Sequence, residues 1–177
     1  MKITHSDWAR RLLLLSLLGP AALVATSCKK DDPVAATPDK DYTVIDEGLI
    51  KKYLSDNAIT TAQRQPSGLY FVPITTDASA RRALPGNTVS VLYTGYLLDA
   101  NRTVFDASSR NGNKPLTFIL GRGQVIPGFD NGIALMHKGD KAQLLIPSGQ
   151  AYGERGAAPS IPPNAVLRFE VELVDVQ

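Results

Sequence analysis

The sequence predicts an α+β fold in which an antiparallel sheet is combined with a small number of helices. Two observations carry this prediction. Several segments after residue 66 alternate apolar and polar residues, which is the pattern of strands that bury one face. The same region holds only one short segment with helical spacing, so helices and strands do not alternate as they do in a parallel α/β sheet. The sequence contains no internal repeat.

The first predicted element is a short amphipathic helix at residues 43–57, TVIDEGLIKKYLSDN. Its apolar residues at helical spacing are Ile45, Leu49, Ile50, Tyr53 and Leu54. Thr43 and Asp46 have the spacing of a capping pair at its start. We expect the apolar face to dock on the following domain; a membrane surface or a partner protein is the alternative.

The other elements follow from alternating segments, turn residues and one helical interval. In chain order we expect strands in SGLYFVPIT (67–75) and TVSVLYTGYLL (88–98), a short strand with a polar loop in RTVFDASSRNGNKP (102–115), a strand in PLTFIL (115–120), a helix in IPGFDNGIALM (126–136), and strands in KAQLLIP (141–147) and VLRFEVELVDV (166–176). Gly95 indicates a bulge or bend in its strand. Pro127 suits the first turn of its helix.

Residues 1–27 have the composition of a bacterial export signal. Basic residues precede an apolar run at 12–24, LLLLSLLGPAALV, and small residues follow it. The run is shorter than the roughly 20 residues that a membrane-spanning helix needs, so we interpret the segment as a cleaved signal. The only cysteine, Cys28, comes next, and this arrangement resembles the lipobox of bacterial lipoproteins, in which the cysteine thiol is acylated. The alternative is a free cysteine near an ordinary cleavage site.

These features divide the chain into four predicted segments. They are a lipoprotein signal peptide at 1–27, a flexible tether at 28–41, an N-terminal helix and strand extension at 42–85, and a main domain at 86–177. The tether is polar, contains proline and has no periodicity. Its first residues, CKKDD, also resemble an export tag of surface lipoproteins. We therefore expect a lipid-anchored protein of the bacterial cell envelope, on the periplasmic or the outer side of the outer membrane.

Charge and residue types exclude several functions. Removing residues 1–27 takes three of the 19 basic residues and one of the 17 acidic residues, so the mature chain carries equal numbers of each and offers no net positive charge to nucleic acid. His137 is the only histidine outside the signal, and its place at the end of the predicted helix suits the helix dipole. Residues 121–128, GRGQVIPG, lack the spacing of phosphate-binding glycine motifs. We therefore expect no catalytic Cys–His pair, no metal and no cofactor.

Several aromatic and apolar residues lie at predicted strand ends and in predicted loops, where a hydrophobic core does not readily account for them. They include Tyr93, Phe105, Phe118, Val125, Ile126, Phe129, Tyr152 and Phe169. Each one, taken singly, is more often a core residue than a site residue. Together they indicate an apolar cup with a few polar groups, which is the composition of a pocket for a small ligand or a peptide.

The order of the motifs resembles the FKBP-type peptidyl-prolyl cis-trans isomerase family from about Gly86 to the C-terminus. The matching motifs are YTG at 93–95, FDASS at 105–109, VIPGF at 125–129, AYG at 151–153 and IPPNAVLRFEVEL at 161–173. Their combined order and spacing are specific to the family. The resemblance implies a curved antiparallel sheet wrapped around one short α-helix, with a proline-binding pocket between them.

The resemblance also implies which residues form the site. The catalytic residues would be Tyr93, Asp106 and Tyr152, and the substrate-binding residues would be Phe105, Phe118, Val125, Ile126, Phe129, Ile161 and Phe169. The Ile126 N–H and the Tyr152 hydroxyl would hold substrate carbonyls. Phe129 replaces the tryptophan that is common in the family at the pocket floor.

The implied activity is rotation of Xaa-Pro peptide bonds in exported proteins. No covalent step is needed if the pocket binds the twisted amide more tightly than the planar one. The alternative is a non-catalytic peptide-binding or chaperone module that uses the same pocket. The expected partners are proline-containing polypeptides and a macrolide ligand, with membrane contact only through the N-terminal lipid and no contact with nucleic acid.

Overall fold

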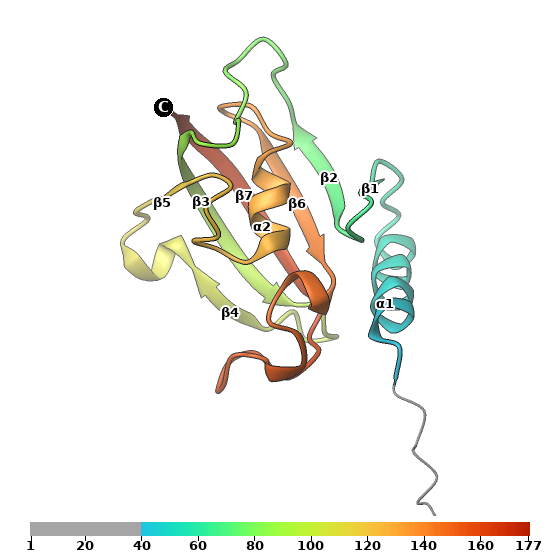
Figure 1. Cartoon of the computed structure of the whole chain (residues 1–177). Helices are drawn as coiled ribbons and strands as arrows, with labels where there is room; N and C mark the ends of the chain where they lie inside the picture. Colours follow the sequence, from blue (N-terminus) through green and yellow to red (C-terminus); the bar gives the residue numbers. More distant parts are fainter. Residues whose placement is uncertain (1–39) are drawn as a thin grey trace, which may run out of the picture. The chain divides into compact units, whose positions relative to one another are not determined.

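The computed structural model of the chain describes residues 40–177, and Figure 1 shows their arrangement. The predicted signal peptide, Cys28 and most of the predicted tether lie outside the described residues. Among residues 40–177, no helix combines the length and the apolar character that a membrane crossing requires. In chain order the elements are α1 (Tyr42–Asp56), β1 (Gln63–Arg64), β2 (Tyr70–Thr75), β3 (Thr88–Leu97), β4 (Val104–Ala107), η1 (Ser108–Asn111), β5 (Leu116–Ile119), α2 (Pro127–Ile133), β6 (Lys141–Ile146), η2 (Ser148–Gln150), η3 (Gly153–Arg155) and β7 (Leu167–Val176).

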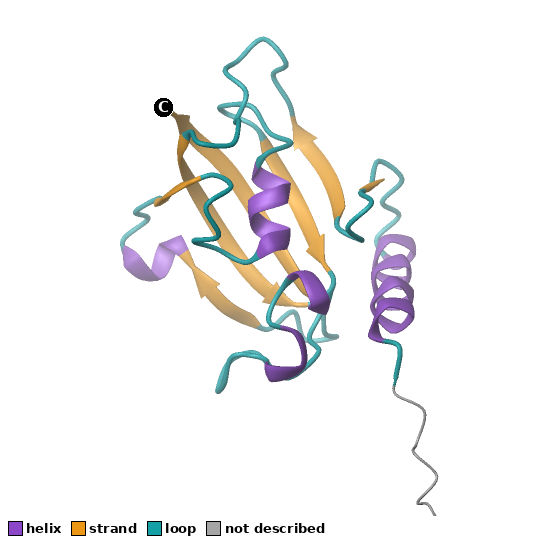
Figure 2. Cartoon of the chain, in the orientation of Figure 1, coloured by secondary structure: helices purple, strands orange, loops and turns teal. Residues whose placement is uncertain are grey.

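One antiparallel sheet organises the described part of the chain. Its strand order is β1-β2-β6-β7-β3-β4, and β5 also pairs with β3. The two longest strands, β3 and β7, have ten residues each and pair along almost their whole length. Figure 2 shows α2 lying across one face of this sheet. The predicted α+β class with an antiparallel sheet and one short helix against it is therefore confirmed.

α2 packs against the inner face of the sheet through two glycines. An added Cβ at Gly128 would overlap with the side chain of Ile146, and an added Cβ at Gly132 would overlap with that of Leu144. Both neighbours belong to β6, so only glycine lets the helix lie this close to the strand. The helix begins with Pro127 in its first turn, as predicted.

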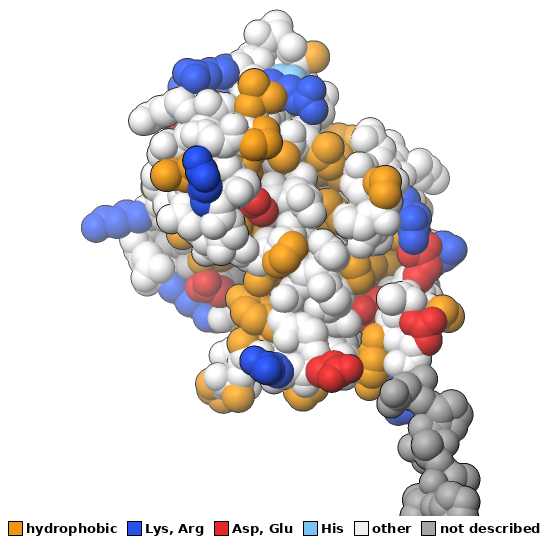
Figure 3. Space-filling view, in the orientation of Figure 1, with side chains coloured by type: hydrophobic (Ala, Val, Ile, Leu, Met, Phe, Trp, Pro, Cys, Tyr) orange, Lys and Arg blue, Asp and Glu red, His pale blue; other side chains and the backbone are white. Residues whose placement is uncertain are grey.

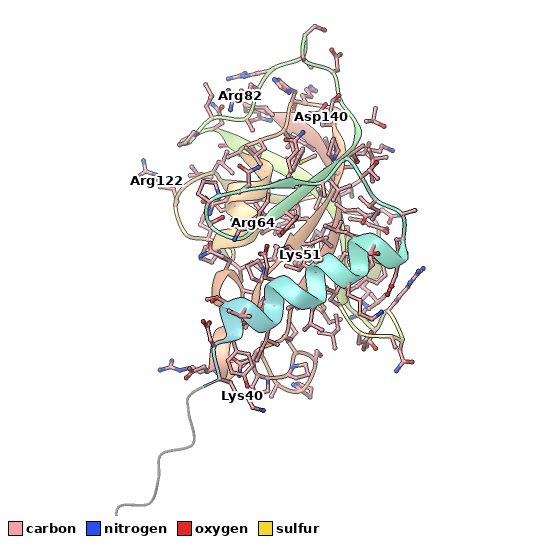
Figure 4. All side chains as sticks on the ribbon, turned by 90° about the vertical axis from the view of Figure 1, so that its right-hand side faces the viewer. Lys40, Lys51, Arg64, Arg82, Arg122 and Asp140 are labelled. Carbon is pink, nitrogen blue, oxygen red and sulfur yellow. The ribbon has the colours of Figure 1, made fainter. Side chains whose placement is uncertain are left out.

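α1 lies on the opposite face of the sheet from α2. Along β2, Phe71 belongs to the core beneath α2, whereas Tyr70 and Val72 pack with α1. Along β6, Leu144 faces the α2 side and Leu145 packs with α1. Since successive residues of a strand point to opposite faces, the two helices cover opposite faces of the sheet. Figure 4 shows α1 crossing in front of the strands.

The predicted docking of α1 on the domain is confirmed, but the predicted apolar face is partly wrong. Ile50 and Leu54 are buried against the sheet, whereas Ile45 and Leu49 are 41% and 44% exposed. The buried row is spaced every four residues and begins with Asp46. A charged residue in the first position of this row could not be recognised from hydrophobic spacing.

The start of α1 also differs from the prediction. Asp41 is the N-cap residue, and its carboxylate accepts a hydrogen bond from the Thr43 N–H at 3.0 Å. Asp46 does not pair with Thr43, because its carboxylate accepts hydrogen bonds from Ser148. The predicted capping pair is therefore wrong, and the helix begins at Tyr42.

The second helix is shorter than predicted and ends at Ile133. Beyond it the chain continues in tight turns, in which the Met136 N–H donates to the Ile133 carbonyl at 3.0 Å. His137 follows these turns, and its Nδ1 lies 3.4 Å from Asp140 Oδ2. The predicted place of His137 at the helix end is therefore wrong, because the helix ends before it.

Candidate active site

A cavity of about 230 Å³ opens between α2, the strands β3 to β5, and the loop that follows β6. Its lining residues are Tyr93, Phe105, Asp106, Leu116, Gln124, Val125, Ile126, Phe129, Tyr152 and Phe169. The structure therefore brings together all of the predicted site residues except two. In the space-filling view, charged side chains are scattered over the face that carries α2, and apolar side chains reach the surface among them (Figure 3).

Three aromatic rings, those of Phe105, Phe129 and Phe169, form the floor of the cavity. The ring centroids of Phe129 and Phe169 are 5.0 Å apart with an interplanar angle of 69°. Those of Phe105 and Phe169 are 5.5 Å apart with an angle of 87°. Edge-to-face packing of this kind is favoured by the aromatic quadrupole. The aromatic floor is thus an apolar surface held by ring-to-ring contacts.

Gly95 of β3 lets the rings of the aromatic floor come together. It pairs with Asp106 of β4 on one side and with Phe169 of β7 on the other. An added Cβ would lie 2.6 Å from Phe105 Cζ and 2.9 Å from Phe169 Cε1, so any side chain would push these rings apart. The register between β3 and β4 also shifts between Gly95 and Tyr96, which confirms the predicted irregularity.

Tyr93 and Asp106 form a hydrogen-bonded pair on the wall of the cavity. The Tyr93 hydroxyl donates to Asp106 Oδ2 at 2.6 Å, and the Ala107 N–H donates to Asp106 Oδ1 at 2.8 Å. Burial raises the pKa of Tyr93, and the hydrogen bond and negative charge of Asp106 raise the pKa further. Tyr93 therefore stays protonated, and its proton is used to hold the carboxylate rather than to reach a ligand.

Two other groups in the lining are free to donate hydrogen bonds. Ile126 is the N-cap residue of α2, and within residues 40–177 no acceptor binds its N–H. Tyr152 is 40% exposed, and its hydroxyl has no hydrogen-bond partner in the same part of the chain. These are the two donors that the resemblance implied for substrate carbonyls.

Phe118 and Ile161 are the predicted site residues that do not line the cavity. Phe118 is 4% exposed, and its ring centroid lies 6.1 Å from that of Phe129, so it packs in the core next to the aromatic floor. Ile161 is 5% exposed, and its backbone forms an isolated bridge with Ala157 within the loop. Both residues support the lining from the protein interior.

Leu116 and Gln124 line the cavity but were not predicted. Leu116 begins β5 and pairs with Val91. Gln124 precedes Val125, and its Oε1 accepts a hydrogen bond from the Ile119 N–H at 2.7 Å. The only signal for Gln124 in the sequence is that it directly precedes the predicted site residues at 125 and 126.

The comparison with known proteins agrees with this geometry. Residues 79–174 match the family described as FKBP-type peptidyl-prolyl cis-trans isomerase. The chain belongs to this family. As a member of the FKBP family it is an enzyme of the peptidyl-prolyl isomerase class, and its named relatives include proteins of yeasts and bacteria.

FK506-binding protein 2 of Candida glabrata is 57% identical over 95 residues, which cover 54% of this chain and 68% of that protein. Peptidyl-prolyl cis-trans isomerase FPR2 of Saccharomyces cerevisiae is 54% identical over 96 residues, which cover 54% of this chain and 70% of that protein. An FK506-binding protein of Neisseria meningitidis is 50% identical over 96 residues, which cover 54% of this chain and 85% of that protein.

Solved structures show the same FKBP-type fold. FkpA from Escherichia coli matches with a TM-score of 0.64 and 35% identity, over 76% of this chain and 61% of the FkpA chain. AtFKBP13 matches with a TM-score of 0.59 and 38% identity, over 66% of this chain and 98% of that one. The chain therefore spans less than two thirds of FkpA and almost all of AtFKBP13.

Proposed function

We propose that this FKBP-type isomerase accelerates cis-trans rotation of Xaa-Pro bonds in exported proteins by non-covalent stabilisation of the twisted amide in its aromatic cavity. One observation carries the proposal. The cavity combines an aromatic floor with two unpaired donors, the Ile126 N–H and the Tyr152 hydroxyl. A proline ring needs the apolar floor, and the peptide carbonyls beside it need donors.

The energy that such a cavity must supply is moderate. A prolyl amide rotates over a barrier of about 18–20 kcal/mol and isomerises unaided in tens to hundreds of seconds. Reaching milliseconds requires a gain of roughly 10⁴-fold, which corresponds to about 5–6 kcal/mol of transition-state stabilisation. The twisted amide loses conjugation and becomes less dipolar, so an apolar surface favours it over the planar amide without any nucleophile.

The polar groups select the twisted geometry. The Ile126 N–H and the Tyr152 hydroxyl donate to carbonyls of the bound peptide, which fixes the chain on either side of the rotating bond. Asp106 is held in place by Tyr93 and Ala107, so its charge has a fixed direction at the cavity wall. Such pre-organised groups need no rearrangement during rotation.

The cellular part of the proposal has separate support. Residues 1–27 and Cys28 have the pattern of a lipoprotein signal, which would place the cavity in the bacterial cell envelope beside exported chains. A macrolide in the same cavity is also proposed, because relatives at 57% and 50% identity are named FK506-binding proteins.

The test is an isomerisation assay on the chain without residues 1–28. We expect cis-to-trans rates that rise linearly with protein concentration, without added metal or cofactor, and that are highest with an apolar residue before proline. FK506 should suppress the rate. A folded protein that binds these peptides at micromolar concentration but leaves the rate at background would be a non-catalytic binding module instead.

A further inference from the structure

We infer that Asp46 of α1 is a positioning residue for Tyr152 in the cavity. The inference rests on the function proposed above, in which the Tyr152 hydroxyl holds a substrate carbonyl. α1 precedes residues 79–174, which match the family, whereas Tyr152 lies within them. The inferred role therefore makes the N-terminal extension part of the machinery that shapes the site.

Asp46 and Ser148 form a buried contact between α1 and the turn that follows β6. Asp46 Oδ2 accepts hydrogen bonds from the Ser148 N–H at 2.8 Å and from the Ser148 hydroxyl at 2.6 Å. Asp46 is 1% exposed and Ser148 is 2% exposed. Hydrogen bonds to a carboxylate are stronger than those between neutral groups, and burial keeps water from replacing either partner. The contact therefore fixes the position of Ser148 relative to α1.

Docking of α1 alone does not explain a carboxylate at this position. The other buried residues of the helix, Ile50 and Leu54, are apolar. An apolar residue at position 46 would continue their row and avoid the cost of burying a polar group. That cost is not fully offset here, because Asp46 Oδ1 is buried without a hydrogen-bond partner among the described residues. What the carboxylate adds is a fixed direction for Ser148.

The space beside this contact is open. A cavity of about 510 Å³ lies between the first half of α1 and the turn, with Glu47, Gly149 and Glu154 among its lining residues. In Figure 4 the N-terminal end of α1, marked by Lys40, lies beside this turn. The Asp46–Ser148 hydrogen bonds join the turn to α1 at the edge of this open space.

A single 3-10 turn, η2, connects Ser148 to the segment that holds Tyr152 in the active-site cavity. The Ala151 N–H donates to the Ser148 carbonyl at 2.9 Å, which ties Ser148 to the residue directly before Tyr152. After Tyr152 the loop is fixed again, because the Asn164 N–H donates to the Gly153 carbonyl at 2.8 Å. Tyr152 thus lies between two anchored points of the backbone.

The opposite side of η2 contacts α2. An added Cβ at Gly128 would lie 3.2 Å from the Gln150 carbonyl oxygen, so the turn lies close against the first turn of α2. That end of the helix also carries Ile126, the second free donor of the cavity. The turn is therefore held between α1 and α2, and α1 supplies its hydrogen-bonded side.

Tyr152 depends on this support because its own side chain has none. Its hydroxyl has no partner within residues 40–177, and 40% of the residue is exposed. The direction of the ring is thus set by the backbone of the loop. A displacement of about 1 Å at a substrate-holding group can lower a rate by up to about 10²-fold.

The test compares Asp46→Ala, Asp46→Asn and Ser148→Ala in the full chain, with Leu54→Ala as the control. Leu54 lies about 12 Å along the same helix and supports docking without touching the turn. We expect Asp46→Ala to lower kcat/KM about tenfold and to shift or broaden the amide resonances of Ala151, Tyr152 and Gly153. Asp46→Asn keeps an acceptor oxygen, so its kcat/KM and its amide resonances should stay close to those of the wild-type chain.

Leu54→Ala should lower the midpoint of thermal unfolding while leaving kcat/KM and these resonances unchanged in the folded range. Ser148→Ala removes only the hydroxyl donor, and we expect it to fold, so it tests the inference even if Asp46→Ala does not fold. We expect Ser148→Ala to lower kcat/KM about threefold and to shift the three amide resonances less than Asp46→Ala does. Its effect should not add to that of Asp46→Ala. Unchanged Tyr152 resonances in folded Asp46→Ala and Ser148→Ala, or an equal loss of kcat/KM in Leu54→Ala, would overturn the inference. The resonances report the coupling even if the wild-type chain shows no isomerase activity, so the two proposals can fail separately.

Discussion

Tyr93 and Asp106 face each other on the wall of the cavity, with the tyrosine hydroxyl oxygen 2.6 Å from the carboxylate oxygen. The proton of this hydrogen bond comes from Tyr93, so the bond is lost when the phenol ionises. Burial and Asp106 raise the pKa of Tyr93 in the folded chain above the ordinary tyrosine value near 10. The pair is therefore coupled to the stability of the fold at alkaline pH.

The first prediction concerns this coupling. Below about pH 10 both the folded and the unfolded chain keep the Tyr93 proton; above it only the unfolded chain releases the proton, so unfolding becomes more favourable as pH rises. We expect the urea unfolding free energy to fall between pH 8.5 and 11 less steeply in Tyr93→Phe than in wild type. Burial also raises the pKa of Tyr70, so Tyr70→Phe should flatten the curve independently. Identical slopes in wild type and Tyr93→Phe would contradict the assignment.

The second prediction concerns the polar groups of the cavity. Tyr152→Phe and Asp106→Ala should each lower kcat/KM by about 1–2 kcal/mol of transition-state stabilisation, the range for one hydrogen bond to a polar or charged group. Tyr152→Phe should hardly change stability, because its hydroxyl has no partner within residues 40–177. Peptide isomerisation and urea unfolding on the same samples separate the two effects. A loss of activity that only follows a loss of folded protein would remove Tyr152 from the proposed site.

The third prediction concerns Gly95. Gly95→Ala should destabilise the fold by about 1–3 kcal/mol and lower isomerase activity, because its Cβ would meet the rings of Phe105 and Phe169. Gly48→Ala is the matched control, since no atom lies within 4 Å of the added Cβ on α1. That control should gain about 0.5–1 kcal/mol and keep full activity. Thermal and urea unfolding of both variants, together with the isomerisation assay, check this contrast.

The fourth prediction concerns the boundary at residue 86, which stays a prediction. A fragment 86–177 should fold but with reduced stability, because it lacks Leu69 and Phe71, two buried residues of the main core. Burial of such side chains contributes about 1.5–3 kcal/mol each. A fragment 58–177, which keeps all described elements except α1, should have a stability between those of fragment 86–177 and the full chain. Circular dichroism and urea unfolding of the fragments decide it; a fragment 86–177 without cooperative unfolding would move the boundary towards the N-terminus.

The fifth prediction concerns anchoring. Wild-type protein expressed with its own signal should take up a labelled fatty acid and sediment with membranes. Cys28→Ala should lose the label and move to the soluble fraction, because the acylated thiol is then missing. A neighbouring change, Ser27→Ala, should keep both properties. Wild-type protein without label would rule out the lipoprotein hypothesis.

Local patterns were sufficient for much of the fold. Alternation in VLRFEVELVDV matches β7, and Pro127 marks the start of α2, since both signals act within a few residues. The predicted end of α2 at Met136 is wrong, because the residues after Ile133 keep helix-like spacing while the Leu135 and Met136 N–H groups donate to carbonyls three residues back instead of four. The role of Asp46 could not be predicted, because its partner Ser148 is 102 residues away in the sequence.

For the site, too, local motifs were informative and long-range packing was not predictable. Motif order was sufficient to bring most of the lining together, including Tyr93, Asp106 and Tyr152. Phe118 and Phe129 are both buried aromatic residues, and the sequence predicts a place in the cavity for both. Which of them borders the cavity depends on how α2 and β5 are placed across the sheet, and that information lies in tertiary packing.

The order of the strands limits how the sheet can pair with strands of other chains. The two longest strands, β3 and β7, both lie inside the sheet, whereas its edge strands are β1, with two residues, and β4 and β5, with four residues each. Beyond β1, the rest of β2 carries Pro73, whose nitrogen has no hydrogen to donate. A long, regular free edge would template intermolecular β-pairing and aggregation. The sheet therefore offers unfolded chains little free strand edge on which to form a mixed sheet.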